Sequence, residues 1–370
     1  MSRTLFINHT NDVFGAETVL LSIFKSINTD RMEYVHVLEP RYKKTNSDFR
    51  RAAMECGVKN IISLPYKNLG GGIIRNFFVL IYNIYAATRT ALYVKKHNID
   101  TIYSNTSVTC LGCIVALLTR KKHIWHIHEP LTEYYISKST LPVLKKLFSY
   151  KRNKFVFISR IHEKEWKNRF HNISDSCIIY NPIKQIPPFL KKPSEKIVFG
   201  YIGSLAVRKN VISLVKAYNA YTTDHIGSSH LLITDNDGDA KKDIHDLVEA
   251  DKNLKNHIIF TKERNIGNLF KNIDILILPS YSETWGMVAT EAMSAGIPVI
   301  ATKNSGLTDI FENNKEVVYI DPYNISDITN ALISISDEKT RTDIANNAIS
   351  KLNAFDFNSN FATHIQALLE

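Results

Sequence analysis

Short apolar runs alternate with helix-like segments along most of this sequence of 370 residues. Strands that alternate with helices form largely parallel sheets that helices cover on both faces. The strands predicted for the first half are Thr4–Asn8, Tyr34–Leu38, Ile61–Leu64, Thr101–Ser104, Lys122–His128, Phe155–Ser159 and Ser176–Tyr180. The helices predicted between them are Ala16–Ser26, Asp48–Cys56, Ile73–Lys96, Thr109–Leu118 and Ile161–Phe170. This alternation predicts an α/β fold class.

A second series of the same kind follows a polar, proline-containing connector at Pro187–Pro193. Its predicted strands are Ile197–Ile202, Leu231–Thr234, His257–Phe260, Ile273–Leu278 and Val299–Ala301, and its predicted helices include Val211–Tyr221, Ala240–Asp251 and Asn265–Lys271. We therefore predict two doubly wound, Rossmann-like domains at 1–183 and 184–354. Residues 355–370 are predicted to form a helix that packs across the domain junction, back toward the N-terminal domain.

Charge is distributed unevenly between the two halves. Residues 1–184 hold 28 Lys and Arg against 13 Asp and Glu, a net charge of +15, whereas residues 185–370 hold 18 against 23, a net charge of −5. The basic half suits anionic lipid headgroups or a phosphate-bearing acceptor, and a merely solvated surface is the alternative. No recognisable nucleic-acid module accompanies the basic residues, so we expect no nucleic-acid partner.

The cysteines and the apolar segments favour a cytoplasmic protein. Cys110 and Cys113 form a lone CxxC without a second pair, so we expect no metal. His9–Asp12 interrupts the first apolar run too early for a signal peptide. The most apolar stretch, Phe77–Val94, contains Asn83 and Arg89. A spanning helix would avoid such residues, so we predict a buried domain helix there.

The segment Pro279–Pro298 places two glutamates, Glu283 and Glu291, on either side of Gly286. It is predicted to run from the end of a strand through a loop, with Glu283 on the loop and Glu291 inside the next helix. Loops at the carboxyl ends of parallel strands are where open α/β sheets bind ligands. A helix start near Gly286 offers unpaired N–H groups to a phosphate, and carboxylates suit sugar hydroxyls. The segment predicts a nucleotide-sugar pocket.

A second loop of the C-terminal half supplies cations for the same pocket. Gly203 follows the first strand of that half, and its loop continues to Arg208 and Lys209. A glycine at a strand end lets the backbone turn tightly, and a guanidinium with an ammonium suits a diphosphate. Neither a G-x-G-x-x-G nor a G-x-x-x-x-G-K-[ST] motif is present, which argues against a dinucleotide oxidoreductase or a P-loop NTPase.

Two stretches of the N-terminal half end predicted strands. Gly15 and Ala16 open the first helix and leave room for a ligand beside helix N–H groups, although an ordinary strand-to-helix turn has the same pattern. His128 ends the stretch His123–Pro130, where it is placed to bond a hydroxyl of a sugar or an acceptor. A satisfied buried histidine is the expectation for His123 or His126.

These motifs together resemble the retaining glycosyltransferases of group 1, also called family 4, which have the GT-B architecture of two domains facing a cleft. The resemblance rests on F-G-A-E at Phe14–Glu17, H-I-H-E-P at His126–Pro130, R-K at Arg208–Lys209 and P-S-x-S-E-T-W-G-x(4)-E-A-M at Pro279–Met293. I-S-R at 158–160 and Y-N-P at 180–182 occur in the expected order. Asn210 stands where the family usually has glycine, Ser204 where many relatives have arginine, and Thr234-Asp235 replaces a common glycine.

The resemblance implies a role for each candidate residue. Arg208 and Lys209 would bind the diphosphate of a UDP-, GDP- or other NDP-sugar donor, with Gly203 on the same loop. Glu283 with the backbone of Gly286, Met287 and Val288 would hold the sugar and phosphate, and Glu291 would bond the ribose. His128, with the Gly15–Ala16 loop, would come from the acceptor-side domain. No cofactor and no metal is implied.

The two carboxylates leave other enzyme classes to be weighed. A glycosidase pair would flank the scissile bond, but the cations beside these acids favour transfer with the leaving diphosphate as proton acceptor. We predict a metal-independent, retaining hexosyltransferase of bacterial surface polysaccharide biosynthesis that acts on a glycan or a polyprenyl-diphosphate-linked glycan. It would be cytoplasmic, with a peripheral position on the cytosolic face of the inner membrane. A nucleotide-sugar epimerase of GT-B architecture and an inactive nucleotide-sugar-binding subunit are the alternatives.

Overall fold

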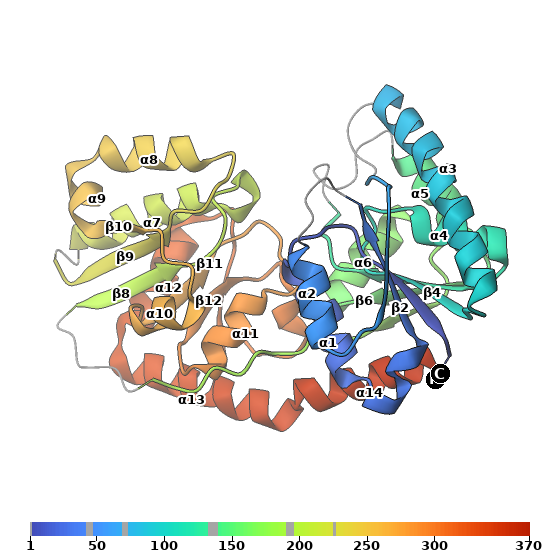
Figure 1. The fold of residues 1–370 in the computed structure, drawn as a ribbon. Coiled ribbons are helices and arrows are strands. Elements are labelled where there is room, and N and C mark those ends of the chain that lie inside the picture. The colour runs from blue at the N-terminus through green and yellow to red at the C-terminus, as the bar shows by residue number, and fades with distance from the viewer. Residues whose placement is uncertain (1, 42–46, 69–72, 132–139, 190–195, 225–226) are drawn as a thin grey trace. The chain divides into compact units, whose positions relative to one another are not determined.

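A computed structural model describes residues 2–41, 47–68, 73–131, 140–189, 196–224 and 227–370. The chain divides into two compact units (Figure 1). Unit 1 comprises Met1–Pro182 and Phe357–Glu370, and unit 2 comprises Ile183–Asp356. Residues 190–193 of the predicted connector lie outside the described part of the chain. Each unit is an α/β domain built on one parallel sheet, which confirms the predicted fold class.

Unit 1 is built on a seven-stranded sheet in the order β3-β2-β1-β4-β5-β6-β7. Its strands are β1 (Thr4–Ile7), β2 (Val35–Pro40), β3 (Asn60–Leu64), β4 (Thr101–Ser104), β5 (Lys122–Ile127), β6 (Asn153–Phe157) and β7 (Ser176–Ile178). Its helices are α1 (Gly15–Ser26), η1 (Thr29–Tyr34), α2 (Asp48–Glu55), α3 (Ile73–Lys96), α4 (Leu111–Thr119), α5 (Leu141–Phe148), α6 (Arg160–Arg169) and α14 (Phe357–Leu369). Every strand pair is parallel because a helix or long crossover separates consecutive strands.

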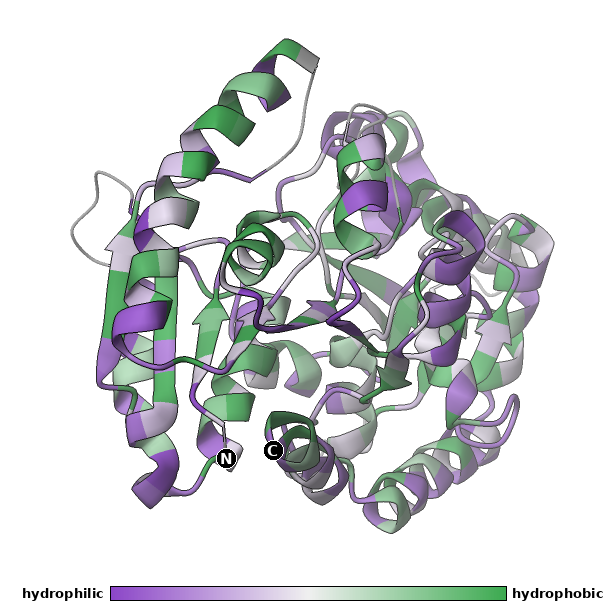
Figure 2. Cartoon of the chain, turned by 90° about the vertical axis from the view of Figure 1, so that its right-hand side faces the viewer, coloured by the Kyte–Doolittle hydropathy of each residue, from purple (hydrophilic) through white to green (hydrophobic). Residues whose placement is uncertain are grey.

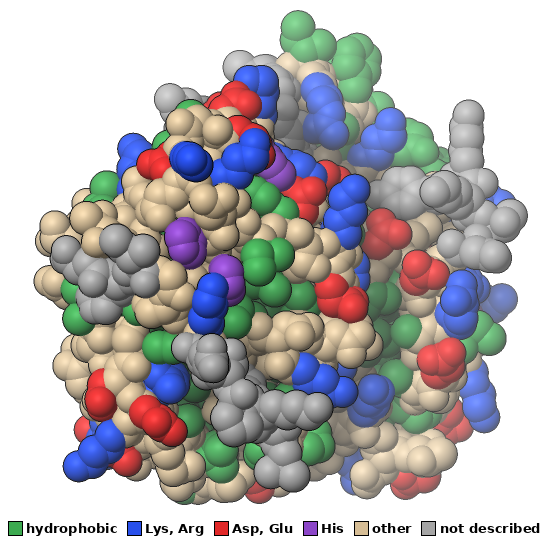
Figure 3. Space-filling view, turned by 90° about the vertical axis from the view of Figure 1, so that its left-hand side faces the viewer, with side chains coloured by type: hydrophobic (Ala, Val, Ile, Leu, Met, Phe, Trp, Pro, Cys, Tyr) green, Lys and Arg blue, Asp and Glu red, His purple; other side chains and the backbone are tan. Residues whose placement is uncertain are grey.

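Unit 2 repeats this plan with a six-stranded sheet in the order β10-β9-β8-β11-β12-β13. Its strands are β8 (Ile197–Tyr201), β9 (Ser229–Thr234), β10 (Ile258–Thr261), β11 (Ile275–Leu278), β12 (Val299–Thr302) and β13 (Val318–Ile320). Its helices are η2 (Val207–Lys209), α7 (Val211–Asp224), α8 (Lys241–Glu249), α9 (Lys252–His257), α10 (Ile266–Lys271), α11 (Met287–Ser294), η3 (Gly306–Asp309), α12 (Ile325–Ser336) and α13 (Glu338–Phe355). On the face of unit 2 seen in Figure 3, acidic and basic side chains are interspersed.

The apolar strands bury their side chains under the helices of their own unit. In unit 1, one cluster joins β1, β2 and β4 to α3 and α4, and another packs Trp125, Phe155 and Phe157 against α5 and α6. In unit 2, Phe199, Leu231 and the alternate residues of β11 pack against α7, α8 and α12. Removal of these side chains from water supplies the main stabilising term.

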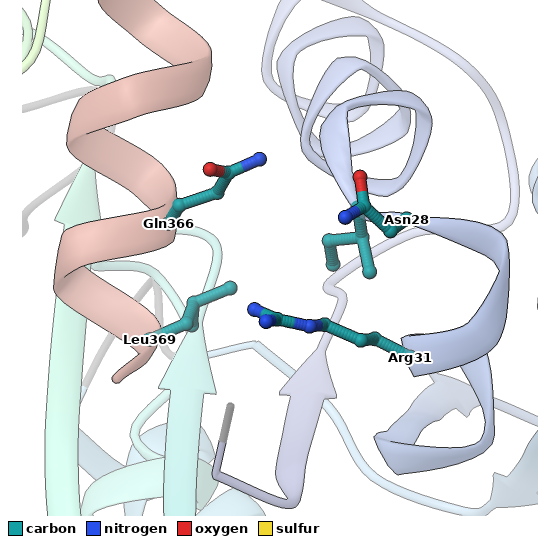
Figure 4. Close-up of a pocket in the computed structure, with 5 residues that line it drawn as sticks. Asn28, Arg31, Gln366 and Leu369 are labelled. Atoms are coloured by element: carbon teal, nitrogen blue, oxygen red, sulfur yellow. The ribbon is translucent and has the colours of Figure 1, made fainter.

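The C-terminal helix α14 belongs to unit 1 and completes its core. Phe357, Phe361 and Ile365 are buried, and the backbone N–H of Ser2 donates to Leu369 O at 3.1 Å. Between α14 and the segment that joins α1 to η1 lies a small pocket lined by Ile27, Asn28, Arg31, Gln366 and Leu369 (Figure 4). Because η1 leads into β2, this pocket lies at the amino-terminal edge of the sheet, away from the strand ends that bind ligands.

The long helix α3 differs from the prediction. Its inner side is buried, and Asn83 Nδ2 and Oδ1 bond the backbone O and N of Lys67 at 2.8 and 2.9 Å. Its outer side is exposed and apolar, so the expectation of a buried domain helix is wrong for that side. By length and composition alone, residues 74–96 are apolar enough to cross a membrane, but only 33% of the most apolar window is buried.

Candidate functional site

The best-placed ligand site of unit 2 lies where its strand order reverses. From β8 the chain proceeds to β9 and β10 on one side, whereas β11 leads to β12 and β13 on the other. Strands β8 and β11 are neighbours in the sheet. The loops that follow them therefore diverge at a topological switch point, which is where open α/β sheets bind ligands. The two motifs predicted to form one pocket are these loops.

The loop after β8 presents Arg208 and Lys209 on the short helix η2. Its start is fixed by Thr234, whose Oγ1 accepts from the N–H of Gly203 at 3.0 Å. Its end is fixed by Asn210, which adopts the left-handed conformation with φ +56°. Asparagine tolerates that conformation, which accounts for its presence where a glycine is usual. The Asn210 amide also donates to Pro279 O and Pro322 O at 3.1 and 2.7 Å.

Lys209 and Glu283 form an ion pair that joins the two loops. Lys209 Nζ lies 2.6 Å from Glu283 Oε2, and their side chains are only 18% and 16% exposed. Ser280 Oγ donates to the same carboxylate oxygen at 3.3 Å. Burial would raise the pKa of Glu283, but Lys209, Arg208 and Ser280 outweigh it and hold that pKa below its usual range. The candidate site therefore carries an ionised carboxylate beside two cations.

Helix α11 begins directly after this ion pair. Gly286 precedes the helix with φ +91°, a backbone conformation that residues with a side chain rarely adopt. A Cβ on Gly286 would lie 3.5 Å from Glu283 Cγ, so the helix start and the carboxylate are adjacent. Met287 and Val288 form the first turn, whose N–H groups have no partner within the helix. These amides and the two cations point to an anionic ligand.

Glu291 lies one turn further along α11 and differs electrostatically from Glu283. Burial raises the pKa of the Glu291 carboxyl, and Lys184 offsets only part of that effect. The groups that act on Glu283 are Lys209, Arg208 and Ser280, and Glu291 is not one of them. The structure thus brings Glu283 together with Lys209 and Arg208. Glu291 does not share these cations, and the charge that acts on it is that of Lys184.

In unit 1, His128 follows β5 directly, one residue beyond the last strand residue Ile127. Its Nε2 atom is buried and has no hydrogen-bond partner among the described residues. Its ring lies 4.0 Å from the ring of His126, centroid to centroid. Burial lowers the pKa of His128, and the neighbouring His126, His162 and His9 lower it further, so the imidazole is neutral near pH 7. A neutral ring nitrogen can bond a hydroxyl.

The Gly15–Ala16 turn lies beside the ends of β1 and β4. A Cβ on Gly15 would meet no atom within 4 Å, so packing does not require glycine there and the space next to the turn is open. The amide of Asn105, which follows β4, donates to Ala16 O at 3.0 Å. This bond holds the start of α1 against the neighbouring strand end.

Sequence reasoning missed several polar residues at this edge of unit 1. His9 Nδ1 lies 3.0 Å from Glu17 Oε1, and Glu17 is fully buried. Glu129, also buried, accepts from the N–H and Oγ of Ser107, both at 3.2 Å. His9 and Asn105 each follow a predicted strand within two residues, and that position could have identified them.

His123 and the CxxC have structural roles. His123 bonds Ser104 Oγ and Asn153 Oδ1 at 2.9 and 2.8 Å, which confirms it as a satisfied buried histidine. Cys110 and Cys113 are free and buried, and burial raises the pKa of Cys110 to about 11. Within the described ranges, no group of three His, Cys, Asp or Glu side chains could hold a metal ion.

Comparison with known proteins identifies the loops of unit 2. Residues 182–351 match the sequence profile of the glycosyl transferases group 1 family. This segment spans β8 to α12 and includes both loops of the candidate site. Residues 182–351 belong to the group 1 glycosyltransferases. The resemblance inferred from the motifs is therefore confirmed.

The similarity of this chain to known glycosyltransferases extends beyond the matched segment. The UDP-Gal:alpha-D-GlcNAc-diphosphoundecaprenol alpha-1,3-galactosyltransferase of Escherichia coli is 25% identical over 278 residues, or 70% of this chain and 72% of that protein. The lipopolysaccharide outer core galactosyltransferase WaaB has a TM-score of 0.76 at 18% identity, with all of both chains covered. Anabaena Alr3699/HepE in complex with UDP-glucose has a TM-score of 0.75 at 18% identity, covering 100% of this chain and 99% of that one. These structures confirm the GT-B fold of two Rossmann-like domains.

Proposed function

We propose that this glycosyltransferase moves a sugar from a nucleotide-diphosphate-sugar to a glycan or lipid-linked glycan, with retention of the anomeric configuration. The observation that carries the proposal is the Lys209–Glu283 pair at the switch point of unit 2, with Nζ 2.6 Å from Oε2. It places a cation for phosphate and a carboxylate for sugar hydroxyls on two loops that meet at the start of α11.

The donor would be held entirely by unit 2. Arg208, Lys209 and the first amides of α11, at Met287 and Val288, would bind the diphosphate. Oε2 of Glu283 bonds Lys209 and Ser280, and Oε1 would accept from a sugar hydroxyl. Glu291, which is farther along the helix, would accept from the ribose hydroxyls.

The acceptor side would use the strand ends of unit 1. His128 Nε2, which has no hydrogen-bond partner in the described part of the chain, belongs to a neutral ring and is suited to bond a hydroxyl of the transferred sugar or the acceptor. The Gly15–Ala16 turn, with open space beside Gly15, would lie against the same ligand.

The reaction needs no group beyond these residues and the two substrates. The bond from the anomeric carbon to the donor phosphate oxygen breaks, and a bond to the acceptor oxygen forms on the same face. The acceptor's proton passes to the leaving diphosphate. Arg208, Lys209 and the α11 amides stabilise the negative charge that develops on that diphosphate. We propose that this design works without a metal ion or cofactor.

Two of the relatives support a bacterial surface polysaccharide as the product. One uses a UDP-sugar and a diphosphoundecaprenol-linked acceptor, and another acts on the outer core of lipopolysaccharide. We propose the same class of acceptor here, with the protein in the cytoplasm and peripheral on the inner membrane. The net charge of +15 in residues 1–184 suits an anionic membrane or a phosphate-bearing acceptor.

Thermal-shift measurements with UDP-, GDP- and ADP-sugars test the donor assignment, because a bound ligand raises the melting temperature. Transfer from the stabilising donor to lipid-linked acceptors, in EDTA, tests the activity, and NMR of the product gives the anomer. Interconversion of donors without an acceptor would identify an epimerase instead. Donor binding with no transfer to any acceptor would indicate an inactive binding subunit.

A further inference from the structure

Helix α3 exposes a continuous apolar surface that neither the donor site nor the acceptor site explains. Ile74, Phe77, Phe78, Ile81, Ile84 and Tyr85 are between 50% and 76% exposed. We call these six side chains the α3 outer face. Soluble proteins rarely expose apolar patches of this kind without an interaction partner. In Figure 2, the helix that reaches highest in the view is α3, and green runs along much of it.

The spacing of these residues places them on the side turned away from the domain. Positions 74, 78, 81 and 85 follow one another at intervals of four and three, which is one stripe of a helix. The opposite stripe, at Asn76, Val79 and Asn83, is buried against unit 1. From Ile74 to Tyr85 the outer face covers about three turns, or roughly 17 Å.

The charge around the α3 outer face is of one sign. The sequence from Gly57 to Ile99 contains six Lys and Arg residues and no Asp or Glu. Arg75 and Arg89 lie on α3 itself and are exposed, and Lys95 and Lys96 are exposed at its end. Aromatic and aliphatic side chains flanked by cations are typical of helices that lie in the interface of an anionic bilayer.

The packing of α3 favours a helix that lies on a membrane over one that spans it. Asn83 is fully buried and its amide bonds both backbone groups of Lys67. Ala86, Ala87 and Val94 belong to the same core cluster as β1 and β4. A spanning position would expose these groups to lipid, whereas an interfacial position leaves every one of these contacts intact.

We propose that the α3 outer face inserts into the surface of an anionic lipid bilayer and holds the protein there. The inference deepens the proposed function, since it locates the contact through which an enzyme acting on lipid-linked glycans would reach its acceptor. The insertion itself rests on the exposed side chains and the charge of unit 1 and does not require transfer activity.

Sedimentation of the full chain with vesicles tests the proposal. We expect binding to vesicles of phosphatidylcholine with phosphatidylglycerol at low salt, weaker binding at high salt, and weakest binding to phosphatidylcholine alone. Phe77→Ser/Phe78→Ser should lower the partition coefficient by about tenfold or more, because two aromatic side chains no longer enter the bilayer. Arg75→Glu/Arg89→Glu should remove most of the salt dependence.

A matched control uses exposed apolar residues of unit 2. Ile259 and Ile333 are 45% and 42% exposed, and Ile259→Ser/Ile333→Ser should leave vesicle binding unchanged. Equal loss in this control, or full binding by Phe77→Ser/Phe78→Ser, would overturn the proposal. So would self-association through α3, seen as a dimer that the same double variant converts to a monomer while no vesicle binds the parent protein.

Insertion of the α3 outer face into the bilayer can also be measured directly by fluorescence quenching. Phe77→Trp should show fluorescence that vesicles with brominated acyl chains quench, and Ile259→Trp should not. The melting-temperature rise with the donor sugar separates this proposal from the proposed function. A double variant that loses vesicles but keeps the donor response supports the lipid contact, whereas a parent protein that binds vesicles without any donor response contradicts only the proposed transfer.

Discussion

At the scale of single residues, the Lys209–Glu283 pair shows how a site can be built from groups that are costly to bury. Each side chain is less than a fifth exposed, and each is stable in that environment because the other is 2.6 Å away. A donor diphosphate would compete for Lys209 and release Glu283 toward the sugar. The two residues therefore act as one unit.

We expect Lys209→Ala and Glu283→Ala each to lower transfer by about tenfold or more, because the first removes charge stabilisation from the leaving group and the second removes a sugar contact. Initial rates with the preferred donor measure the effect, and circular dichroism checks that the variants are folded. Lys303→Ala is the control, since Lys303 pairs with Asp321 on the surface at 2.7 Å and should matter little. Unchanged turnover in both site variants would contradict the assignment.

The ion pair between half-buried His9 and buried Glu17 should make stability depend on pH. Burial alone would lower the pKa of His9, but the Glu17 carboxylate outweighs it, so the pKa lies above the usual 6.5. A histidine whose pKa is raised in the folded protein stabilises it fully at a pH below the unfolded-state pKa of 6.5. This stabilisation is lost as the pH rises through the pKa of the folded state. The melting-temperature difference between the parent and His9→Gln should therefore be larger at about pH 6 than at about pH 8.5.

Glu17→Gln provides the second arm of that experiment. This substitution removes the carboxylate of the same ion pair. The double variant His9→Gln/Glu17→Gln should therefore have the same pH dependence of the melting temperature as either single variant. A melting-temperature difference that is constant across this range would show that the pair does not titrate as inferred.

At the scale of elements, the sequence motifs predicted the secondary structure around the candidate site well, because each motif was tied to a strand end. The ends of β8 and β11 were predicted within one residue, and Gly286, whose φ is +91°, stands at the predicted helix start. The pairing of Lys209 with Glu283 could not be predicted, since no periodicity relates two loops so far apart in the sequence. Only the strand order β8-β11 brings them together.

Short or weakly patterned elements were missed for physical reasons. The predicted helix Ala240–Asp251 corresponds to α8, but the six-residue helix α9, which the Asp251 side chain starts by accepting from the N–H of Asn253 and Leu254, was not predicted. Helix α5 has only eight residues, too few for a clear helical period. The apolar α3 outer face was read as core, because hydropathy alone does not distinguish an exposed apolar stripe from a buried one.

The start of α11 allows a test of the helix terminus itself. Gly286 and Gly296 flank this helix with φ of +91° and +79°. Alanine at either position should cost about 1–2 kcal/mol of stability, because side chains disfavour the left-handed conformation. Only Gly286→Ala should also weaken donor binding, since it displaces the first amides of α11 from the phosphate. Titration of the donor by thermal shift distinguishes the two variants, and equal donor affinity would contradict a role for this terminus.

At the scale of the whole molecule, the last helix returns to the domain that the chain leaves at Pro182. Asp356, with φ +45°, separates α13 of unit 2 from α14 of unit 1. Helix α14 is attached by buried apolar side chains and by Lys122, whose Nζ donates to Leu368 O at 3.1 Å. Unit 1 thus depends on residues that are synthesised after unit 2 is complete.

We therefore expect that Phe361→Ala destabilises unit 1 selectively. Phe361 is 3% exposed, and truncation of a buried phenylalanine costs about 3–5 kcal/mol. Denaturant unfolding followed by the fluorescence of Trp125 and Trp166, which are fully buried in unit 1, should shift to lower denaturant. His364→Ala, on the exposed side of α14, is the control and should leave the transition unchanged. Because the proposed donor site is built from unit 2 alone, the donor-induced rise in melting temperature should persist in Phe361→Ala. If the donor no longer raised the melting temperature of Phe361→Ala, donor binding by unit 2 would depend on the folding of unit 1, contrary to the separate cores of the two units.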